Sequence, residues 1–171
     1  MLLSDKIRTT LFSLIDLIDS SGEEELHYKP APDSWSILEC VEHICLVNHN
    51  IAQLIQTPPP ASHENKLSEL YGEGKLNHLL VTKRDMKRVA PEKVTPKGIF
   101  KTPGEAKEAI YRDTETILRT LEATSIGQQT HTIPHHALGE MTKTDWLHFM
   151  IAHTQRHLLQ IETIKEHYKK K

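Results

Sequence analysis

Two histidines stand one helical turn apart in the segment DWLHFMIAHTQRHLLQIETI, residues 145–164. Side chains four positions apart lie on the same side of a helix, so the imidazoles of His153 and His157 are close enough to share a metal ion. Zinc and nickel both accept a neutral imidazole nitrogen as a ligand. The alternative is that one or both are core histidines whose nitrogens are satisfied by hydrogen bonds.

The pair falls on the apolar face of its helix, among Trp146, Met150, Ile161 and Ile164. Burying two imidazoles requires partners for all of their ring nitrogens, and a metal ion supplies two such partners at once. Metalloproteases use the same spacing but carry a glutamate directly after the first histidine as general base. Thr154 occupies that position here. A metalloprotease helix is therefore disfavoured, while a metal site and a pair of core histidines both stay open.

A metal site on this helix needs a third ligand from a facing helix. The segment 37–55 offers His43 at the flank of its apolar face and His49 close to its polar side, so His43 is the better candidate and His49 is expected to face solvent. Cys40, one turn before His43, is a possible soft ligand, although a small buried cysteine is more often a core residue. Three further histidines precede the last helix and could approach the same end of a bundle, but the pattern assigns them no role: His131, His135 and His136.

Four segments with the periodicity of amphipathic helices must position these side chains. They are residues 3–18, 37–55, 103–121 and 142–171. Three of them open on a capping residue with an acidic residue three positions later: Ser36 with Glu39, Thr102 with Glu105, and Thr142 with Asp145. The motif SSGEEE ends the first segment, and TPPPAS stops the second because proline lacks an amide donor.

Residues 57–101 connect the second helix to the third. Residues 76–89 of this connection form a weak amphipathic pattern that predicts a short helix. Residues 90–104, which reach the start of the third helix, read as an ordered loop punctuated by prolines. Only THTIPHH, residues 130–136, alternates in the manner of a short strand. The sequence therefore predicts an all-α fold, a four-helix bundle with a long crossover between helices two and three, in a single domain spanning residues 1–171.

The composition excludes several classes of function. The formal net charge is -2, and there is no basic stripe, only 3 Phe and 4 Tyr, so nucleic-acid binding is disfavoured. No apolar run is long enough to cross a membrane, and charges interrupt the N-terminal apolar pattern, so a cytoplasmic protein is expected. Cys40 and Cys45 are five positions apart on one helix and point to different sides, which argues against a disulfide.

Three segments together resemble the DinB-like superfamily, in its YfiT-like branch. They are PDSWSILECVEHI at residues 32–44, APEKVTPKGIFKTPGEA at residues 90–106 and HHALGEMTKTDWLHFMIAHTQRHLLQI at residues 135–161. The resemblance spans nearly the whole chain. It departs from the family pattern in one place, because the family often has a His-Pro-x-x-Gly turn before the last helix and His136 stands here where the proline would be.

The resemblance implies a four-helix bundle in an up-down-down-up arrangement, often assembled as a homodimer. It also implies one divalent metal ion, nickel or zinc, held by three histidines at positions that match His43, His153 and His157. The rest of the coordination sphere is open to substrate. Family members with known activity are metal-dependent transferases of bacillithiol or mycothiol and related isomerases, and many others are described only as metal-dependent hydrolases.

These properties predict an enzyme that transfers a low-molecular-weight thiol, of the bacillithiol kind, to a small electrophilic substrate. Three neutral imidazoles leave the ion its full charge, so it can lower the pKa of a thiol or of a water. A hydrolase using water at the same site and a non-catalytic metal-binding or ligand-binding bundle are the alternatives. Gln160, one turn beyond His157, is a candidate to orient a ligand or a bound water. Arg156 either pairs with a substrate carboxylate or is a surface residue.

Overall fold

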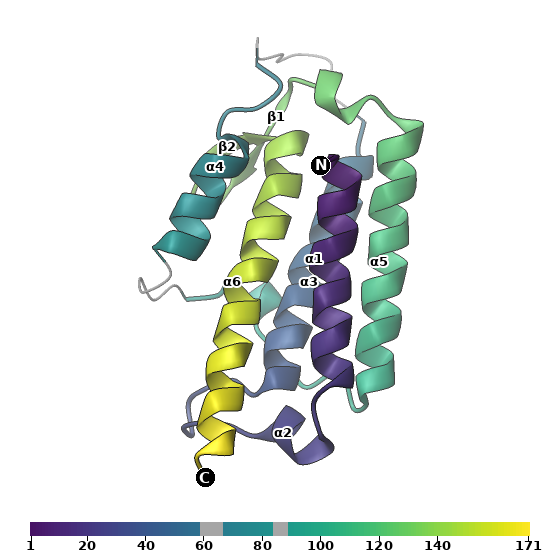
Figure 1. Cartoon of the computed structure of the whole chain (residues 1–171). Helices are drawn as coiled ribbons and strands as arrows, with labels where there is room; N and C mark the ends of the chain where they lie inside the picture. The colour runs from purple at the N-terminus through teal and green to yellow at the C-terminus, as the bar shows by residue number, and fades with distance from the viewer. Residues whose placement is uncertain (59–66, 84–88) are drawn as a thin grey trace.

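Four long helices form the body of the protein. In the computed structural model, which describes residues 1–58, 67–83 and 89–171, they are α1 (Leu3–Asp19), α3 (Ile37–Gln56), α5 (Pro103–Ala123) and α6 (Lys143–Lys169). Their bounds agree with the predicted segments within a few residues. The all-α four-helix bundle is therefore confirmed (Figure 1).

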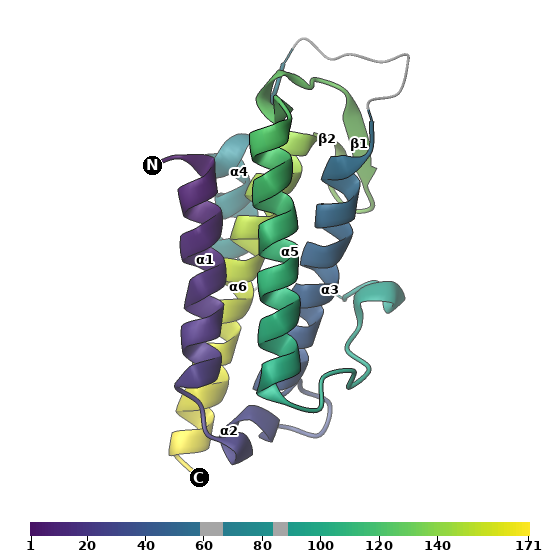
Figure 2. The same ribbon diagram turned by 90° about the vertical axis from the view of Figure 1, so that its right-hand side faces the viewer.

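The helices run in the predicted up-down-down-up order. Helices α1 and α6 run from the upper end of the bundle to the lower end, while α3 and α5 run in the opposite direction (Figures 1 and 2). Both α1 and α3 pack against α5 and α6. Because α3 and α5 are parallel, the chain has to return along the length of the bundle between them, which is what the long crossover does.

The predicted capping residues begin three of the four helices. The hydroxyl groups of Ser36, Thr102 and Thr142 accept the backbone N–H of the acidic residue three positions later, and that carboxylate reaches back to the capping residue. Each such box satisfies two amide donors that a helix start otherwise leaves without partners. The starts of the helices that carry the histidines are thus fixed by local sequence.

The apolar stripes of the four helices meet in one core. Its members include the predicted positions of each helix, all almost completely buried: Ile7, Leu11, Leu14 and Ile18 on α1, Ile37, Val41, Ile44, Ile51 and Ile55 on α3, Ala106, Ile110, Ile117 and Leu118 on α5, and Met150, Ile161 and Ile164 on α6. Cys40 and Cys45 are buried in this core as free thiols, as expected. Removal of this apolar surface from water is the main force that holds the helices together.

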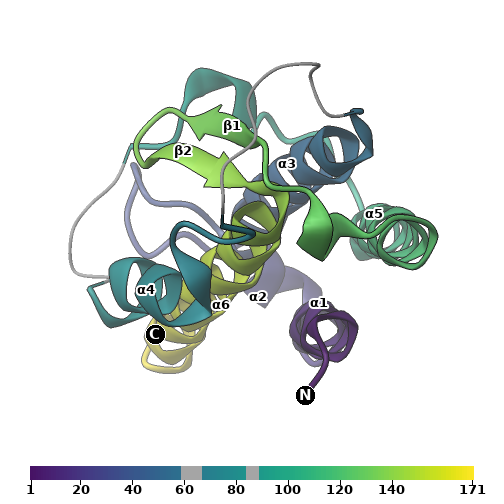
Figure 3. The same ribbon diagram turned by 90° about the horizontal axis from the view of Figure 1, so that it is seen from above.

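Short elements connect the long helices. Helix α2 (Glu23–His27) lies in the turn after α1, and α4 (Gly72–Asn77) continues into a π-helical turn, His78–Thr82, that packs along α6. Strands β1 (Thr132–His135) and β2 (Gly139–Thr142) pair as an antiparallel hairpin beside the upper end of α6 (Figures 1 and 3). Two 3-10 turns complete the set, at Glu92–Val94 and Ile126–Gln128.

Three of these elements differ from the sequence prediction. The short helix expected within residues 76–89 begins earlier, at Gly72, and residues 84–88 lie outside the described part of the chain. Residues 59–66, which include most of the proline-rich stop TPPPAS, also lie outside it. Strand β2 and helix α2 were not predicted, because each is too short to show a period of its own. The strand exists because its backbone pairs with β1, whose short alternating pattern was recognised.

The first turn of α6 joins the upper ends of three elements. Lys143 is buried, and its ammonium group donates to the carbonyl oxygens of Ile55 and Thr57 at the end of α3, at 2.9 and 2.5 Å. Asp145 accepts the backbone N–H groups that lead into α4, those of residues 70, 71 and 72. These contacts fix the register of α6 against α3, and hence the height at which side chains of the two helices meet.

No described helix is long and apolar enough to span a lipid bilayer.

Candidate metal centre

Three histidines from two facing helices converge inside the bundle. His43 comes from α3, and His153 and His157 come from α6, which packs against α3. One ring nitrogen of each lies within 4.8 Å of the other two. The three side chains are almost completely buried, with 4%, 8% and 7% of their surface exposed. The residues that the sequence put forward as a ligand set are therefore brought together.

Two of the three rings are held by oxygen atoms on the side away from the cluster. The Nδ1 atom of His43 lies 2.7 Å from the carbonyl oxygen of Val94, and the Nδ1 atom of His157 lies 2.9 Å from Oε1 of Gln160. Because these oxygens can only accept, each Nδ1 carries the proton and donates it. The Nε2 lone pairs of both rings are left for the interior of the cluster, the arrangement that metal-ligating histidines use.

His153 completes the group differently. Its Nε2 lies 3.1 Å from Nε2 of His43, and its Nδ1 is buried with no hydrogen-bond partner among the described residues. With the proton on Nε2, His153 donates to His43; with the proton on Nδ1, two lone pairs face each other at close range. A cation between the rings relieves that repulsion, so the donor set fits a divalent ion bound by neutral imidazole nitrogen.

Burial keeps the three imidazoles neutral. It lowers the pKa of His43, an effect that the hydrogen bond to Val94 partly offsets. Burial and repulsion from His43 lower the pKa of His157 to about 3, against the opposing effect of the hydrogen bond that His157 donates to Gln160. Burial, with the neighbouring rings of His157 and His43, also places the pKa of His153 well below its ordinary value. Neutral imidazole is the form that binds a metal, so the site is ready for one at neutral pH.

Aromatic rings cover two sides of the cluster. The indole of Trp35, just before the start of α3, lies 4.9 Å from the ring of His43 and stacks on His157 at 6.3 Å, measured between centroids. The ring of Phe149 stacks on His153 at 5.4 Å. These contacts fix the orientations of the imidazoles and keep water from the sides of the group.

The two candidate supporting residues lie beside the site. Gln160 accepts the Nδ1 proton of His157 and so holds the orientation of that ring. The guanidinium of Arg156 is half-buried and donates to the carbonyl oxygen of Leu80 in the π-helical turn, at 3.0 Å. Its positive charge contributes to the low pKa values of both His153 and His157, which places that charge at the edge of the cluster.

The other candidates lie outside the group. His49 is 45% exposed at its side chain and pairs through Nδ1 with the buried Asp113 at 3.0 Å, so it faces solvent as expected. Cys40 is fully buried, and burial raises its pKa to about 12, so it stays a protonated thiol in the core. His135 packs on Phe149, whose ring lies between it and His153 of the cluster. His131 is buried near the upper end of the bundle, and His136 stacks on His135 at the surface.

The sequence profile of the DinB superfamily matches residues 7–161 of the chain. The chain belongs to the DinB superfamily. The chain is also similar to the uncharacterized protein YuaE of Bacillus subtilis (strain 168), with 23% identity over 145 residues, which are 85% of this chain and 86% of that protein. The fold is similar to the crystal structure of TT2238, a four-helix bundle protein, with a TM-score of 0.62 and 16% sequence identity. The match covers 94% of this chain and 96% of the TT2238 chain. That likeness concerns the fold alone.

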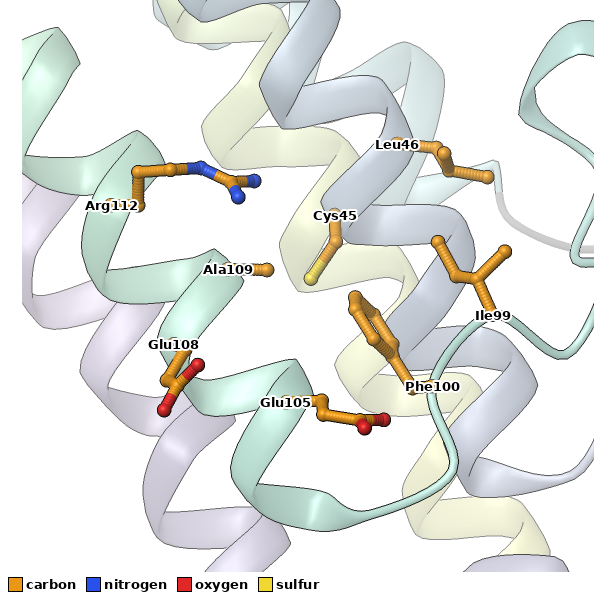
Figure 4. A pocket seen from close by; sticks show the side chains of 8 residues that line it. All are labelled: Cys45, Leu46, Ile99, Phe100, Glu105, Glu108, Ala109 and Arg112. Atoms are coloured by element: carbon orange, nitrogen blue, oxygen red, sulfur yellow. The ribbon is translucent and has the colours of Figure 1, made fainter.

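A separate surface pocket of about 240 Å³ is lined in part by α3. It opens between α3, α5 and the segment before α5, and none of the three histidines lines it. The lining residues are Cys45, Leu46, Ile99, Phe100, Glu105, Glu108, Ala109 and Arg112 (Figure 4). Burial raises the pKa of Cys45 to about 12, so its thiol is not a nucleophile at neutral pH.

Proposed function

We propose that the protein is a divalent-metal-dependent enzyme that transfers a low-molecular-weight thiol to a small electrophile at the site of His43, His153 and His157. The observation that carries the proposal is the fixed tautomer of two of the rings, whose Nδ1 protons are bound by Val94 and Gln160. Three neutral nitrogen donors suit nickel or zinc. A bound ion would lower the pKa of a thiol that enters the site and so supply a nucleophile at neutral pH.

The surroundings favour a thiol over water as the nucleophile. A thiol has an ordinary pKa of about 8.5 and needs only a small decrease to ionise at neutral pH, whereas water needs a far larger one. The three-histidine group holds no carboxylate among the described residues that would serve as general base for water. Arg156 places a positive charge beside the cluster, which stabilises a thiolate or a carboxylate carried by the substrate.

The first experiment is metal content by elemental mass spectrometry on untagged protein, for the wild type, His157→Ala and the control His27→Ala, which changes an exposed histidine. We expect about one divalent ion per chain in the wild type and the control, and loss of the ion from His157→Ala. A wild type that stays metal-free after reconstitution with nickel and with zinc would rule out the three-histidine site.

The second experiment separates the possible reactions of the loaded protein. The nickel and zinc forms are assayed for conjugation of low-molecular-weight thiols to a chromogenic aryl halide, and for cleavage of a model ester without any thiol. Conjugation that His157→Ala loses supports thiol transfer. Ester cleavage without conjugation contradicts it in favour of hydrolysis, and metal binding without either activity contradicts an enzymatic role.

A further inference from the structure

A buried carboxylate lies directly next to a histidine of the cluster along α3. Glu42 is 1% exposed, and its two oxygens accept the backbone N–H groups of Lys97 and Ile99, at 2.5 and 3.1 Å. No cationic side chain pairs with this carboxylate among the described residues. Burying a charge is unfavourable unless hydrogen bonds replace its hydration, and here the two backbone donors do so.

Glu42 and His43 hold the same piece of chain at two points. His43 donates to the carbonyl oxygen of Val94, and Glu42 accepts from residues 97 and 99. We call residues 94–99 the strap. Val94 is itself buried, and its 3-10 turn packs on α3. The oxygen that fixes the tautomer of His43 is therefore carried by a segment whose far end is anchored to the neighbouring residue of the same helix.

Gly98 allows the strap to turn so that the amides on either side of it can reach the carboxylate of Glu42. Its φ is +68°, in the left-handed region that side chains other than glycine rarely adopt. It lies between the two amides that point at the carboxylate of Glu42, and turns of this kind direct several backbone N–H groups to one anion. A Cβ at this position would meet only Nζ of Lys101, at 4.0 Å. An alanine here would thus act through backbone strain alone.

We propose that Glu42 is a positioning residue for the metal centre, and that occupancy of the centre by a metal ion and closure of the strap on α3 stabilise each other. Releasing the strap removes Val94 from His43, so the ring loses the bond that keeps its proton on Nδ1 and its Nε2 free. By thermodynamic reciprocity, an ion that requires this tautomer must in turn favour the closed strap. The second statement rests on the proposed metal site, whereas the first can be tested without metal.

The metal-free test is the tautomer of His43, read from the 15N chemical shifts of its imidazole at neutral pH. We expect the Nδ1–H form in the wild type and a mixture of tautomers in Glu42→Gln and in Gly98→Ala. The matched controls are Glu115→Gln, an exposed carboxylate on α5, and Gly127→Ala, a glycine without a positive φ and with open space around it. Variants that keep the pure Nδ1–H form would overturn the role of Glu42. Because Glu42→Gln and Gly98→Ala change the strap by different chemistry, the test still gives an answer if one of them fails to fold.

The metal test is a chelator competition with zinc and with nickel, together with amide hydrogen exchange of residues 97 and 99. We expect Glu42→Gln and Gly98→Ala to raise the dissociation constant at least about tenfold, as loss of an outer hydrogen bond does at other metal sites. We also expect saturating zinc to slow exchange of these amides in the wild type. Unchanged affinity in both variants, or exchange that zinc leaves unaltered, would overturn the coupling. A wild type that binds no ion removes the proposed function and the coupling, but leaves the tautomer result standing on its own.

Discussion

The Nε2 atoms of His43 and His153 lie 3.1 Å apart, on helices that the long crossover and α5 separate in sequence. Because His43 donates through Nδ1 to Val94, its Nε2 is a lone pair directed at His153. Only a proton on His153 or a cation between the rings makes this approach favourable. Protons and metal ions therefore compete for the same position, and the acidity of the three histidines governs both binding and stability.

Acid is expected to destabilise the metal-free protein. The pKa of His157 is about 3 in the folded protein, against an ordinary value of 6.5. Below pH 6.5, His157 is therefore protonated in the unfolded chain but stays neutral in the folded chain. The stability that this neutral ring allows is complete above that pH and is lost progressively as the pH falls towards 3. Between pH 7.5 and pH 5, His157 alone should account for about 2 kcal/mol.

Urea unfolding in the presence of a chelator measures this effect. The His157→Phe variant should lose about 2 kcal/mol less stability than the wild type over that pH interval, since it has no ring nitrogen to protonate there. The control His27→Phe changes an exposed residue and should follow the wild type. A wild type and a His157→Phe variant with equal pH dependence would show that the buried ring is not held neutral by the fold.

Gln160→Ala should weaken metal binding without removing it. The change deletes the oxygen that accepts the Nδ1 proton of His157, so the ring can rotate and change tautomer. Losing such a partner raises the dissociation constant about 10- to 100-fold at comparable sites. Chelator competition measures it, and Gln155→Ala is the matched control, because Gln155 is a half-buried glutamine on the same helix that bonds Asn77 instead. Equal affinities for the two variants would contradict the orienting role.

Side-chain pattern and the family resemblance put forward the three histidines as ligands and Gln160 as a residue beside His157, but they could not predict the partner of His43. His43, His153 and His157 stand at helical positions that periodicity places on inward faces, and periodicity is a property of the sequence. The partner of His43 is the backbone carbonyl of Val94, and a carbonyl is present in every residue. Which one arrives at the ring depends on the course of a loop set by tertiary contacts. The same holds for Arg156, whose contact with Leu80 depends on the π-helical turn.

In the fold, too, the long helices could be predicted from the sequence and the short elements could not. The four long helices carry enough turns for a period to appear, and three of them begin with capping boxes whose residues are readable. Helix α2 has 5 residues and strand β2 has 4, too few for a period. Gly139, with φ +78°, begins β2 in the left-handed region that glycine tolerates. Such short elements exist because the helices bring their ends together.

Nickel binding should quench tryptophan fluorescence mainly through Trp35. Its ring lies 4.9 Å from that of His43 and stacks on His157, so an ion bound by these residues would lie close to the indole. Quenching by an open-shell ion falls steeply with distance. Trp146, two helical turns before His153, contacts Phe149 and serves as the internal control. In a nickel titration Trp35→Phe should lose most of the quenching and Trp146→Phe should retain it, and the reverse result would place the ion elsewhere.

Asp145→Asn should destabilise the bundle more than any exposed carboxylate change. The buried carboxylate of Asp145 accepts from four backbone N–H groups, those of Leu70, Tyr71, Gly72 and Thr142. Burial raises the pKa of Asp145, but these bonds outweigh it and the net pKa lies below the ordinary 3.8. An amide that offers one acceptor oxygen and two new donors to this shell is expected to cost about 3 kcal/mol of stability near pH 7.

The pH dependence distinguishes this charge effect from a simple packing defect. Because the folded pKa of Asp145 is lowered, its contribution is fully present above pH 3.8 and is lost as the pH falls through the folded value. The difference in unfolding free energy between the wild type and Asp145→Asn should therefore be constant from pH 7 to pH 5 and shrink below 3.8. Asp16→Asn, at an exposed position of α1, controls for the general loss of a negative charge. A difference that persists unchanged at low pH would mean that shape, and not the ionised carboxylate, holds α4 to α6.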